Sequence, residues 1–257
     1  MATIVSFHAH PDDETIVTGG TMALASDGGH RVVAVFATRG ELGEVGEGVL
    51  DESEALGDRR VVETQRSADV LGVQRIEFLG YLDSGMAGEA TNHADGAFAA
   101  ADVDEAAERL AAILRAEQAD VLTIYDEHGN YGHPDHIQVH DVGMRAAELA
   151  GTERVYQATV SRQHFVRVAE ENPDTMPDDT PDAEELDLGV DESLITTVVD
   201  VQSVLDRKRA AMAAHASQIT PESFFLAMPD DIFAKTFGTE WFIRVGHDPA
   251  DRETWIL

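Results

Sequence analysis

The sequence contains no cysteine and only two lysines, Lys208 and Lys235. Without thiols the chain forms no disulfide and offers no thiolate to a metal, so any metal ligand must be a histidine or a carboxylate. No run within the 257 residues is as long and apolar as a membrane-spanning helix. The residues after Met1 show neither a basic leader nor a small-residue cleavage site. These absences predict a soluble, cytoplasmic protein.

Positively charged residues of every kind are scarce. The 18 Lys and Arg residues are outnumbered by 49 Asp and Glu, which gives a formal net charge of -31. Nucleic acids and anionic lipid surfaces are bound through clustered Lys and Arg, so neither is expected as a partner. We expect a small-molecule substrate, and a homo-oligomer is compatible with the sequence. The acidity fits either a high-salt host or an arginine-favouring genome.

Short β-rich runs alternate with helix-patterned segments, as is typical of βαβ units and a mainly parallel sheet. We predict one domain over residues 1–257, an α/β fold with a Rossmann-like sheet, helices on both faces and extra C-terminal strand and helix elements. The expected strands are 3–8, 31–37, 76–81, 121–125, 154–161 and 194–201, with another at the end of 224–245. The expected helices are 15–26, one ending near 71, 103–118, one from 134 to 151, and 203–217.

Two segments interrupt this pattern. Residues 170–192 are dense in Asp, Glu and Pro and are expected to form an acidic loop. The glycine-rich residues 40–48 fit either a lid near a site or a plain surface loop.

The residues that suggest chemistry follow the first and the fourth predicted strand. Residues 9–14 read Ala-His-Pro-Asp-Asp-Glu, and residues 131–136 read Tyr-Gly-His-Pro-Asp-His. Ligands of open parallel sheets bind at the carboxyl ends of the strands, so these two motifs can converge. A catalytic zinc site takes three histidine or carboxylate ligands and keeps a fourth position open for water. His10, Asp13 and His136 would provide the three ligands. Fe(II) could occupy the same ligands.

The paired motifs resemble those of the LmbE-like, or phosphatidylinositol-glycan de-N-acetylase-like (PIG-L), deacetylases, which include deacetylases of mycothiol and bacillithiol biosynthesis. The resemblance spans most of the chain and implies a zinc-dependent hydrolase that removes an N-acetyl or N-acyl group from a glucosamine-type molecule. The roles that it implies are metal ligation by His10, Asp13 and His136, general base for Asp12, electrophile or acid for His133, orientation of His133 for Asp135, and contact with the oxyanion for Tyr131.

The chemistry of the residues agrees with these roles. A metal acidifies water and polarises an amide carbonyl, so a neighbouring carboxylate such as Asp12 suffices as the base. An imidazolium at His133, held by Asp135, could stabilise the tetrahedral intermediate and protonate the amine. Helix N-capping would explain the aspartates of both motifs but not their histidines.

Polar residues also follow the second and third predicted strands and are candidate sugar contacts. The candidate substrate-binding residues are Arg39, Glu41, Arg60 and Asp83. For Arg60 and Asp83 the assignment comes from the resemblance to the thiol-glycoside branch of the family, and Arg59 could take the place of Arg60.

Four alternatives remain open. The chain could be an amidase of a larger thiol-sugar conjugate, of the mycothiol S-conjugate type. A non-haem Fe(II) oxygenase would use the same two histidines and one carboxylate, but would not need Asp12 or His133. A nucleotide-binding module lacks support, because no Gly-x-Gly-x-x-Gly follows the first strand. A non-catalytic metal-binding relative would not be expected to retain the proposed catalytic positions.

Overall fold

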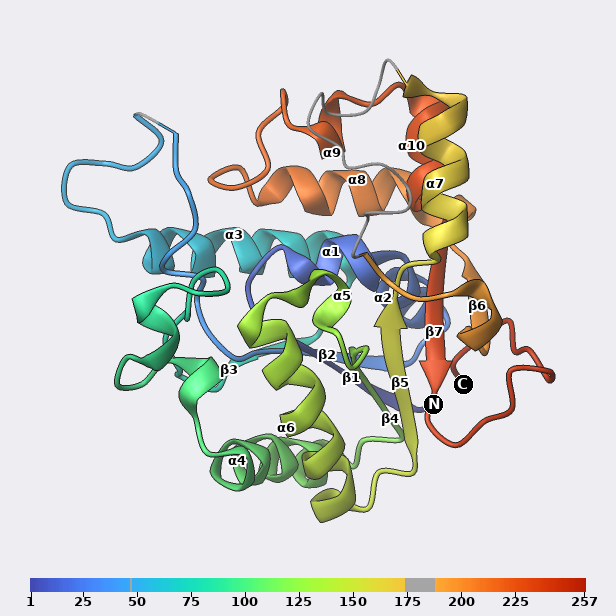
Figure 1. The fold of residues 1–257 in the computed structure, drawn as a ribbon, viewed down its shortest axis with the longest axis horizontal. Helices are drawn as coiled ribbons and strands as arrows, with labels where there is room; N and C mark the ends of the chain where they lie inside the picture. Colours follow the sequence, from blue (N-terminus) through green and yellow to red (C-terminus); the bar gives the residue numbers. More distant parts are fainter. Residues whose placement is uncertain (47, 174–187) are drawn as a thin grey trace.

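Seven strands form one sheet in the computed structural model, which describes residues 1–46, 48–173 and 188–257 (Figure 1). Their order across the sheet is β3 (Arg75–Phe78), β2 (Arg31–Phe36), β1 (Thr3–His8), β4 (Val121–Tyr125), β5 (Arg154–Thr159), β7 (Thr239–Arg244) and β6 (Thr197–Asp200). The first five strands in this order are parallel, and β7 runs antiparallel to both β5 and β6. The predicted mainly parallel sheet is confirmed.

Helices cover both faces of the sheet because its strands are apolar on both sides. Val5 and Phe7 of β1 pack in one apolar cluster with the helices α4 (Val103–Glu117) and α6 (Pro134–Ala150). Ile4 belongs to a second cluster on the opposite face. The helices that contribute to the second cluster are α2 (Gly19–Asp27), α3 (Leu56–Leu71) and α8 (Leu205–Ala214). Figure 1 shows these two helix layers on either side of the strands.

A third apolar cluster lies beside α8. It contains Met212 of α8 and Phe233 and Phe237 of α10 (Asp230–Phe237). The remaining helices are α1 (Asp13–Val17), α5 (Gly129–Gly132), α7 (Arg162–Glu171) and α9 (Phe224–Ala227), with 3-10 turns at Ala90–His93, Phe98–Ala100, Glu192–Leu194 and Gln202–Val204. None of the helices in the described residues is long and apolar enough to cross a membrane.

The structure differs from the sequence-based expectations at several element boundaries. The first helix is two helices, because the backbone at Thr18 leaves the helical region with φ -137° and ψ -1°. The third strand ends at Phe78 instead of residue 81. Helices α7, α9 and α10 were not predicted. Helix α7 includes the first two residues of the expected acidic loop 170–192. Residues 174–187 of that loop lie outside the described residues.

A buried ion pair joins the C-terminal elements to the first half of the chain. Lys208 Nζ lies 2.6 Å from Glu240 Oε1, and both side chains are 1% exposed. The Glu240 carboxylate also accepts hydrogen bonds of 2.8 Å from the main-chain amides of Gly20 and Thr21 in the first turn of α2. Helix N-termini favour such an anion. The pair therefore connects α8, β7 and α2.

We predict that Glu240→Leu destabilises the fold strongly, because it leaves the Lys208 ammonium buried without a counter-charge. Removing one partner of a buried pair costs about 3–5 kcal/mol, and each 1 kcal/mol corresponds to about 2–4 °C in Tm for a chain of this size. The Tm should fall by about 6–20 °C in thermal unfolding. The double variant Lys208→Met/Glu240→Leu should recover much of this loss.

The control is Arg145→Gln, because Arg145 pairs with Asp104 in solvent. It should leave the Tm unchanged. A Tm for Glu240→Leu equal to that of Arg145→Gln would contradict a structural role of the buried pair.

Candidate active site

The two sequence motifs meet at the carboxyl edge of the sheet. β1 and β4 pair in parallel, with Ile4 opposite Val121 and Ser6 opposite Thr123. The loops that follow the two strands therefore start side by side. The Asp126 carboxylate fixes the second loop, because it accepts the main-chain amides of His128 at 3.1 Å and Asn130 at 2.9 Å.

His10, Asp13 and His136 converge at this edge. The Asp13 Oδ2 atom lies 3.4 Å from His10 Nδ1 and 3.4 Å from His136 Nε2. Burial by itself would raise the pKa of Asp13, but the opposite charge and close approach of the His136 and His10 rings outweigh it and hold that pKa well below its usual range. Asp13 is thus a carboxylate facing two imidazoles, the donor chemistry of a zinc or iron site.

The position of His10 is set from its other ring nitrogen. His10 Nε2 lies 3.1 Å from the Asp135 carboxylate, which also accepts hydrogen bonds from the main-chain amide and the hydroxyl of Ser84, at 3.0 and 2.5 Å. Metal-ligating histidines commonly donate their second nitrogen to a carboxylate in this way. Asp135 therefore leaves His10 Nδ1 facing Asp13.

This placement differs from the role that the sequence suggests for Asp135. The sequence assigns its carboxylate to His133, whereas the structure places it on His10 and Ser84. The group that reaches His133 is the main-chain amide of Asp135, which donates to His133 Nδ1 at 3.1 Å. His133 contacts this amide because it is the N-cap residue of α6, and its side chain accepts a hydrogen bond from the first turn of that helix.

A metal fits these residues. Both ring nitrogens of His136 are buried and have no hydrogen-bond partner among the described residues, which is costly for a polar group unless something binds it. Two sets of side chains among the described residues place their donor atoms within 4.8 Å of one another. They are His10, His133 and His136, and His10, Asp83 and Asp135. Asp13 belongs to neither set, although it lies close to both His10 and His136.

Asp12 sits beside this cluster in a strained backbone conformation, with φ 95°. Strain of this kind at a non-glycine residue is a feature of functional sites. Its main-chain amide donates to Glu14 Oε2 at 2.8 Å, and its carboxylate lies 3.2 Å from Arg60 Nη2. Burial and the neighbouring Asp13 raise the pKa of Asp12 to about 6, against the opposing effect of Arg60. A carboxylate with such a pKa suits general base catalysis near neutral pH.

Glu14 and His215 form a buried pair beneath Asp12. His215 Nε2 lies 2.7 Å from Glu14 Oε1, which also accepts the Ser67 hydroxyl at 2.6 Å. Burial alone would lower the pKa of His215, but the attraction of Glu14 outweighs it and raises that pKa. In return, His215 helps to lower the pKa of Glu14, although burial opposes this. Glu14 can therefore hold the Asp12 amide as a charged acceptor.

His133 and Tyr131 lie against the other histidines of the cluster. The His133 ring centroid is 4.7 Å from that of His10, and the Tyr131 ring is 4.9 Å from that of His136. Burial, together with charge on His10 and His136, lowers the pKa of His133 to about 4. This favours a neutral imidazole over the imidazolium considered from the sequence. Tyr131 is 47% exposed, and burial of its hydroxyl group together with nearby carboxylates raises its pKa.

The four candidate sugar contacts occupy different environments. Asp83 is buried near His10 Nε2, at 3.5 Å, and Glu41 accepts the main-chain amide of Asp83 at 3.2 Å. Arg39 is half exposed and pairs with Asp58. Arg60 is 3% exposed and donates to the carbonyls of Pro11 and Gly40, so it supports the Asp12 loop. Substrate contact by these residues stays a prediction.

Sequence reasoning missed a layer of polar groups under the site. His8 Nδ1 lies 3.0 Å from the Tyr125 hydroxyl and its Nε2 lies 2.8 Å from the Ser6 hydroxyl. Burial lowers the pKa of His8 to about 4, so it is a neutral structural group. Alternation along β1 puts Ser6 and His8 on one side of the strand, a signal that the motif itself does not contain.

Buried histidines and carboxylates at the carboxyl edge of a parallel sheet, with a base of raised pKa beside them, define a metal-dependent hydrolase. Residues 5–147 match the family model of the GlcNAc-PI de-N-acetylases (PIG-L). The chain belongs to this family.

Similar sequences and similar solved structures agree with this family assignment. The 1D-myo-inositol 2-acetamido-2-deoxy-alpha-D-glucopyranoside deacetylase of Streptomyces avermitilis is 41% identical, over 96% of this chain and 93% of that protein. The N,N'-diacetylchitobiose deacetylase of Pyrococcus horikoshii shares the fold, with a TM-score of 0.56, 24% identity and coverage of 95% and 83% of the two chains. So does the 4-carboxy-2-hydroxymuconate hydratase of Pseudomonas putida, with a TM-score of 0.61, 20% identity and coverage of 96% and 97%.

These findings confirm the predicted family and the enzyme class, a metal-dependent deacetylase, and the solved structures confirm the fold. The hydratase shows that the fold alone does not decide the reaction. The residue roles and the identity of the metal stay predictions.

We predict that Gly129→Ala weakens metal binding. Gly129 has φ 64°, and an added Cβ would lie 2.7 Å from His136 Cβ and 2.7 Å from the main-chain nitrogen of Ile137. The new methyl must therefore displace His136. We expect metal affinity, measured by competition with a chelator, to fall at least about tenfold.

The matched control is Gly132→Ala, which has the same kind of backbone strain, φ 83°, but no heavy atom within 4 Å of the new Cβ. It should lose some stability and keep the metal. Equal metal loss in both variants would show that the clash with His136 is not the cause.

A pH dependence follows from the raised pKa of His215. Its stabilising effect is complete below its usual value of 6.5 and is lost as pH rises through the higher folded-state pKa. The effect of Glu14 is present above 4.5 and is lost as pH falls through its lowered folded-state pKa. The free energy of unfolding of wild type minus that of His215→Gln, from urea titrations, should therefore be largest at about pH 5.5 and smaller at about pH 8.5. A difference that grows with pH would contradict this pairing.

Proposed function

We propose that this chain is a divalent-metal-dependent N-deacetylase that releases a carboxylate from the 2-amino group of a glucosamine derivative. The observation that carries the proposal is the convergence of His10, Asp13 and His136 next to Asp12, with His136 ring nitrogens that have no hydrogen-bond partner in the described part of the chain. Zinc is the metal we expect, and Fe(II) suits the same donors.

His10, Asp13 and His136 are the ligands we propose, through His10 Nδ1, the Asp13 carboxylate and His136 Nε2. The Asp135 contact on His10 Nε2 supports this choice, since it leaves Nδ1 as the free donor. A cation held there would supply positive charge that polarises the amide carbonyl and acidifies water.

Asp12 takes the proton of the attacking water in this proposal. The water oxygen bonds to the carbonyl carbon, the carbon–nitrogen bond breaks, and Asp12 returns a proton to the departing amine. The Arg60 and Glu14 contacts hold Asp12 in place for both transfers. Its pKa of about 6 keeps it mostly ionised at neutral pH and still able to deliver a proton.

His133 is proposed to stabilise the oxyanion as a neutral donor. Because the Asp135 amide donates to Nδ1, the neutral ring carries its proton on Nε2. This nitrogen can donate a hydrogen bond to the carbonyl oxygen as negative charge develops. The hydroxyl of Tyr131, whose ring lies 4.9 Å from that of His136, is a second proposed donor.

The substrate we propose is a 2-acetamido-2-deoxyglucose linked to a further polar group. The curated relatives at 35–41% identity are named as deacetylases of an inositol-linked acetamido sugar. Asp83 and Glu41 are suited to accept sugar hydroxyls. A cytoplasmic location, a single domain and a homo-oligomer remain expectations.

The proposal predicts separable effects on metal content and turnover. Wild type should bind about one metal per chain and release amine from N-acetylglucosamine-type substrates. Asp12→Asn should keep the metal and lose at least about a hundredfold in kcat, the usual range for removing a general base. His136→Ala should lose the metal. Metal content by elemental analysis and amine release by fluorescamine measure the two effects, and an Asp12→Asn variant with wild-type turnover would contradict the role of Asp12.

A comparison of Asp13→Ala with His133→Ala identifies the third ligand. We expect Asp13→Ala to lose the metal and His133→Ala to retain it with reduced kcat. The opposite result would favour the three-histidine set of His10, His133 and His136.

A further inference from the structure

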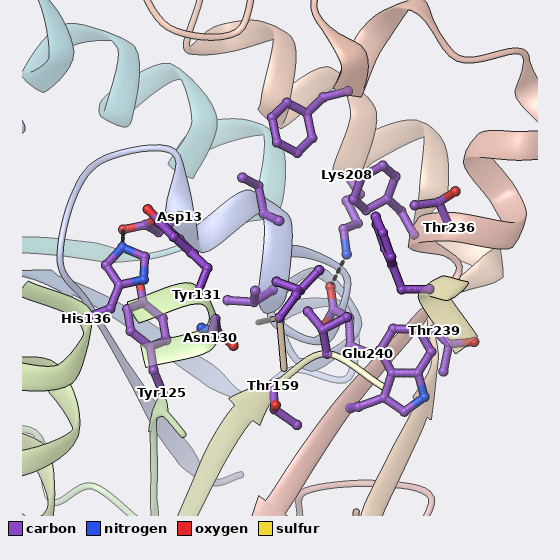
Figure 2. A pocket seen from close by; sticks show the side chains of 18 of the residues that line it. Asp13, Tyr125, Asn130, Tyr131, His136, Thr159, Lys208, Thr236, Thr239 and Glu240 are labelled. Atoms are coloured by element: carbon purple, nitrogen blue, oxygen red, sulfur yellow. Dashed lines mark hydrogen bonds and ion pairs between the residues drawn. The ribbon is translucent and has the colours of Figure 1, made fainter. Parts of the chain in front are cut away.

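An apolar cavity of about 320 Å3 opens from one side of the proposed metal site. Asp13, Tyr131 and His136 line its near end, and aromatic side chains from the C-terminal elements, among them Phe225 and Trp241, form its walls. Figure 2 shows Asp13 and His136 at one end and Thr236 and Thr239 at the other. The cavity is therefore continuous with the site of the chemistry.

Several polar groups in the cavity wall have partners, although the buried Asn130 Oδ1 has no hydrogen-bond partner among the described residues. Lys208 and Glu240 neutralise each other in their buried pair (Figure 2). The Thr236 hydroxyl donates to the carbonyl of Ile232, within its own helix. Apart from Asp13 at the near end, the charged side chains among the described residues of these walls are Lys208 and Glu240, which are paired, so the cavity favours an apolar occupant.

Away from the cavity, the surroundings of His10 are polar. Asp83 and Asp135 both face His10, and the Glu41 carboxylate accepts a hydrogen bond from the main-chain amide of Asp83. None of these residues lines the cavity. An amide placed at the metal site has its sugar on one side of the scissile bond and its acyl group on the other. With the hydroxylated sugar toward Asp83, the acyl group points toward Tyr131 and the cavity.

We infer that the cavity binds the acyl group of the substrate, and that the site accepts, besides the acetamido sugar proposed above, glucosamine amides with a longer apolar acyl chain. This inference rests on the proposed amide hydrolysis. The reaction is balanced by one water, since the acyl carbon gains the water oxygen, the carbon–nitrogen bond breaks, and a fatty carboxylate and a free amine leave.

The size of the cavity supports a chain rather than a methyl group. A cavity of roughly 150 Å3 takes up one benzene ring, and 320 Å3 is about twice that volume. An acetyl group would leave most of this apolar surface against water. Each methylene that enters should raise kcat/KM about three- to fourfold until the cavity is full.

The experiment uses the zinc-loaded full chain and a series of N-acetyl-, N-butanoyl-, N-hexanoyl- and N-octanoylglucosamine, with amine release as the readout. Wild type should show kcat/KM rising along the series. Thr236→Phe fills the far end of the cavity and should lower kcat/KM for the octanoyl amide at least about tenfold, with the acetyl amide within about twofold of wild type. Thr236→Val, which keeps the volume, should behave as wild type.

Binding is measured separately from turnover, so that the two proposals can fail separately. In the Asp12→Asn variant, N-octanoylglucosamine should change the fluorescence of Trp241, which lines the cavity, at lower concentration than N-acetylglucosamine does. A Trp255→Phe background isolates that signal.

The possible outcomes separate the two ideas. Hydrolysis of the acetyl amide with kcat/KM flat or falling along the series would overturn the acyl-chain inference and leave the deacetylase intact. Chain-length-dependent binding without any hydrolysis would support the cavity assignment and overturn the proposed function. If neither binding nor hydrolysis occurs, both proposals are wrong.

Discussion

Three consecutive carboxylates, residues 12–14, are held at the end of one buried strand, and this concentration of negative charge organises the site. Each of these acids contacts a positively charged or titratable side chain that another segment of the chain contributes. Arg60 of α3 reaches Asp12, and His215, which follows α8, pairs with Glu14. Asp13 faces His10 and His136, the latter in α6. Left uncompensated, these buried acids would repel one another and cost several kcal/mol each. The motif therefore needs the whole fold around it.

The sequence predicts this site well where the information is local. A strand followed by His-Pro-Asp appears twice, and parallel strands end at one edge, so convergence of His10 with His136 follows without any knowledge of tertiary contacts. The mainly parallel sheet follows from the same periodicity. Boundaries were less predictable, because turns such as the one at Thr18 depend on how a helix meets its neighbours.

What the sequence could not predict depends on contacts between distant segments. His215 is one histidine among several in its sequence, and only its 2.7 Å contact with Glu14 distinguishes it. The Asp135 carboxylate turns to His10 because Ser84, more than fifty positions away in sequence, completes its hydrogen bonds. The apolar cavity is likewise assembled from α1, α5 and the C-terminal helices. Aromatic residues such as Phe225 look like ordinary core in the sequence, although here they line an opening.

The buried position of Lys208 has a practical consequence for handling the protein. Of the two lysines, Lys208 is 1% exposed and held by Glu240, whereas the side chain of Lys235 is exposed on α10. An amine-reactive dye or crosslinker will therefore reach a single lysine side chain in the folded chain, besides the exposed α-amino group of Met1. That lysine is two residues from Phe233 and next to Thr236 of the cavity wall. The scarcity of lysine thus places one reactive side chain where a reporter would sense an occupied cavity.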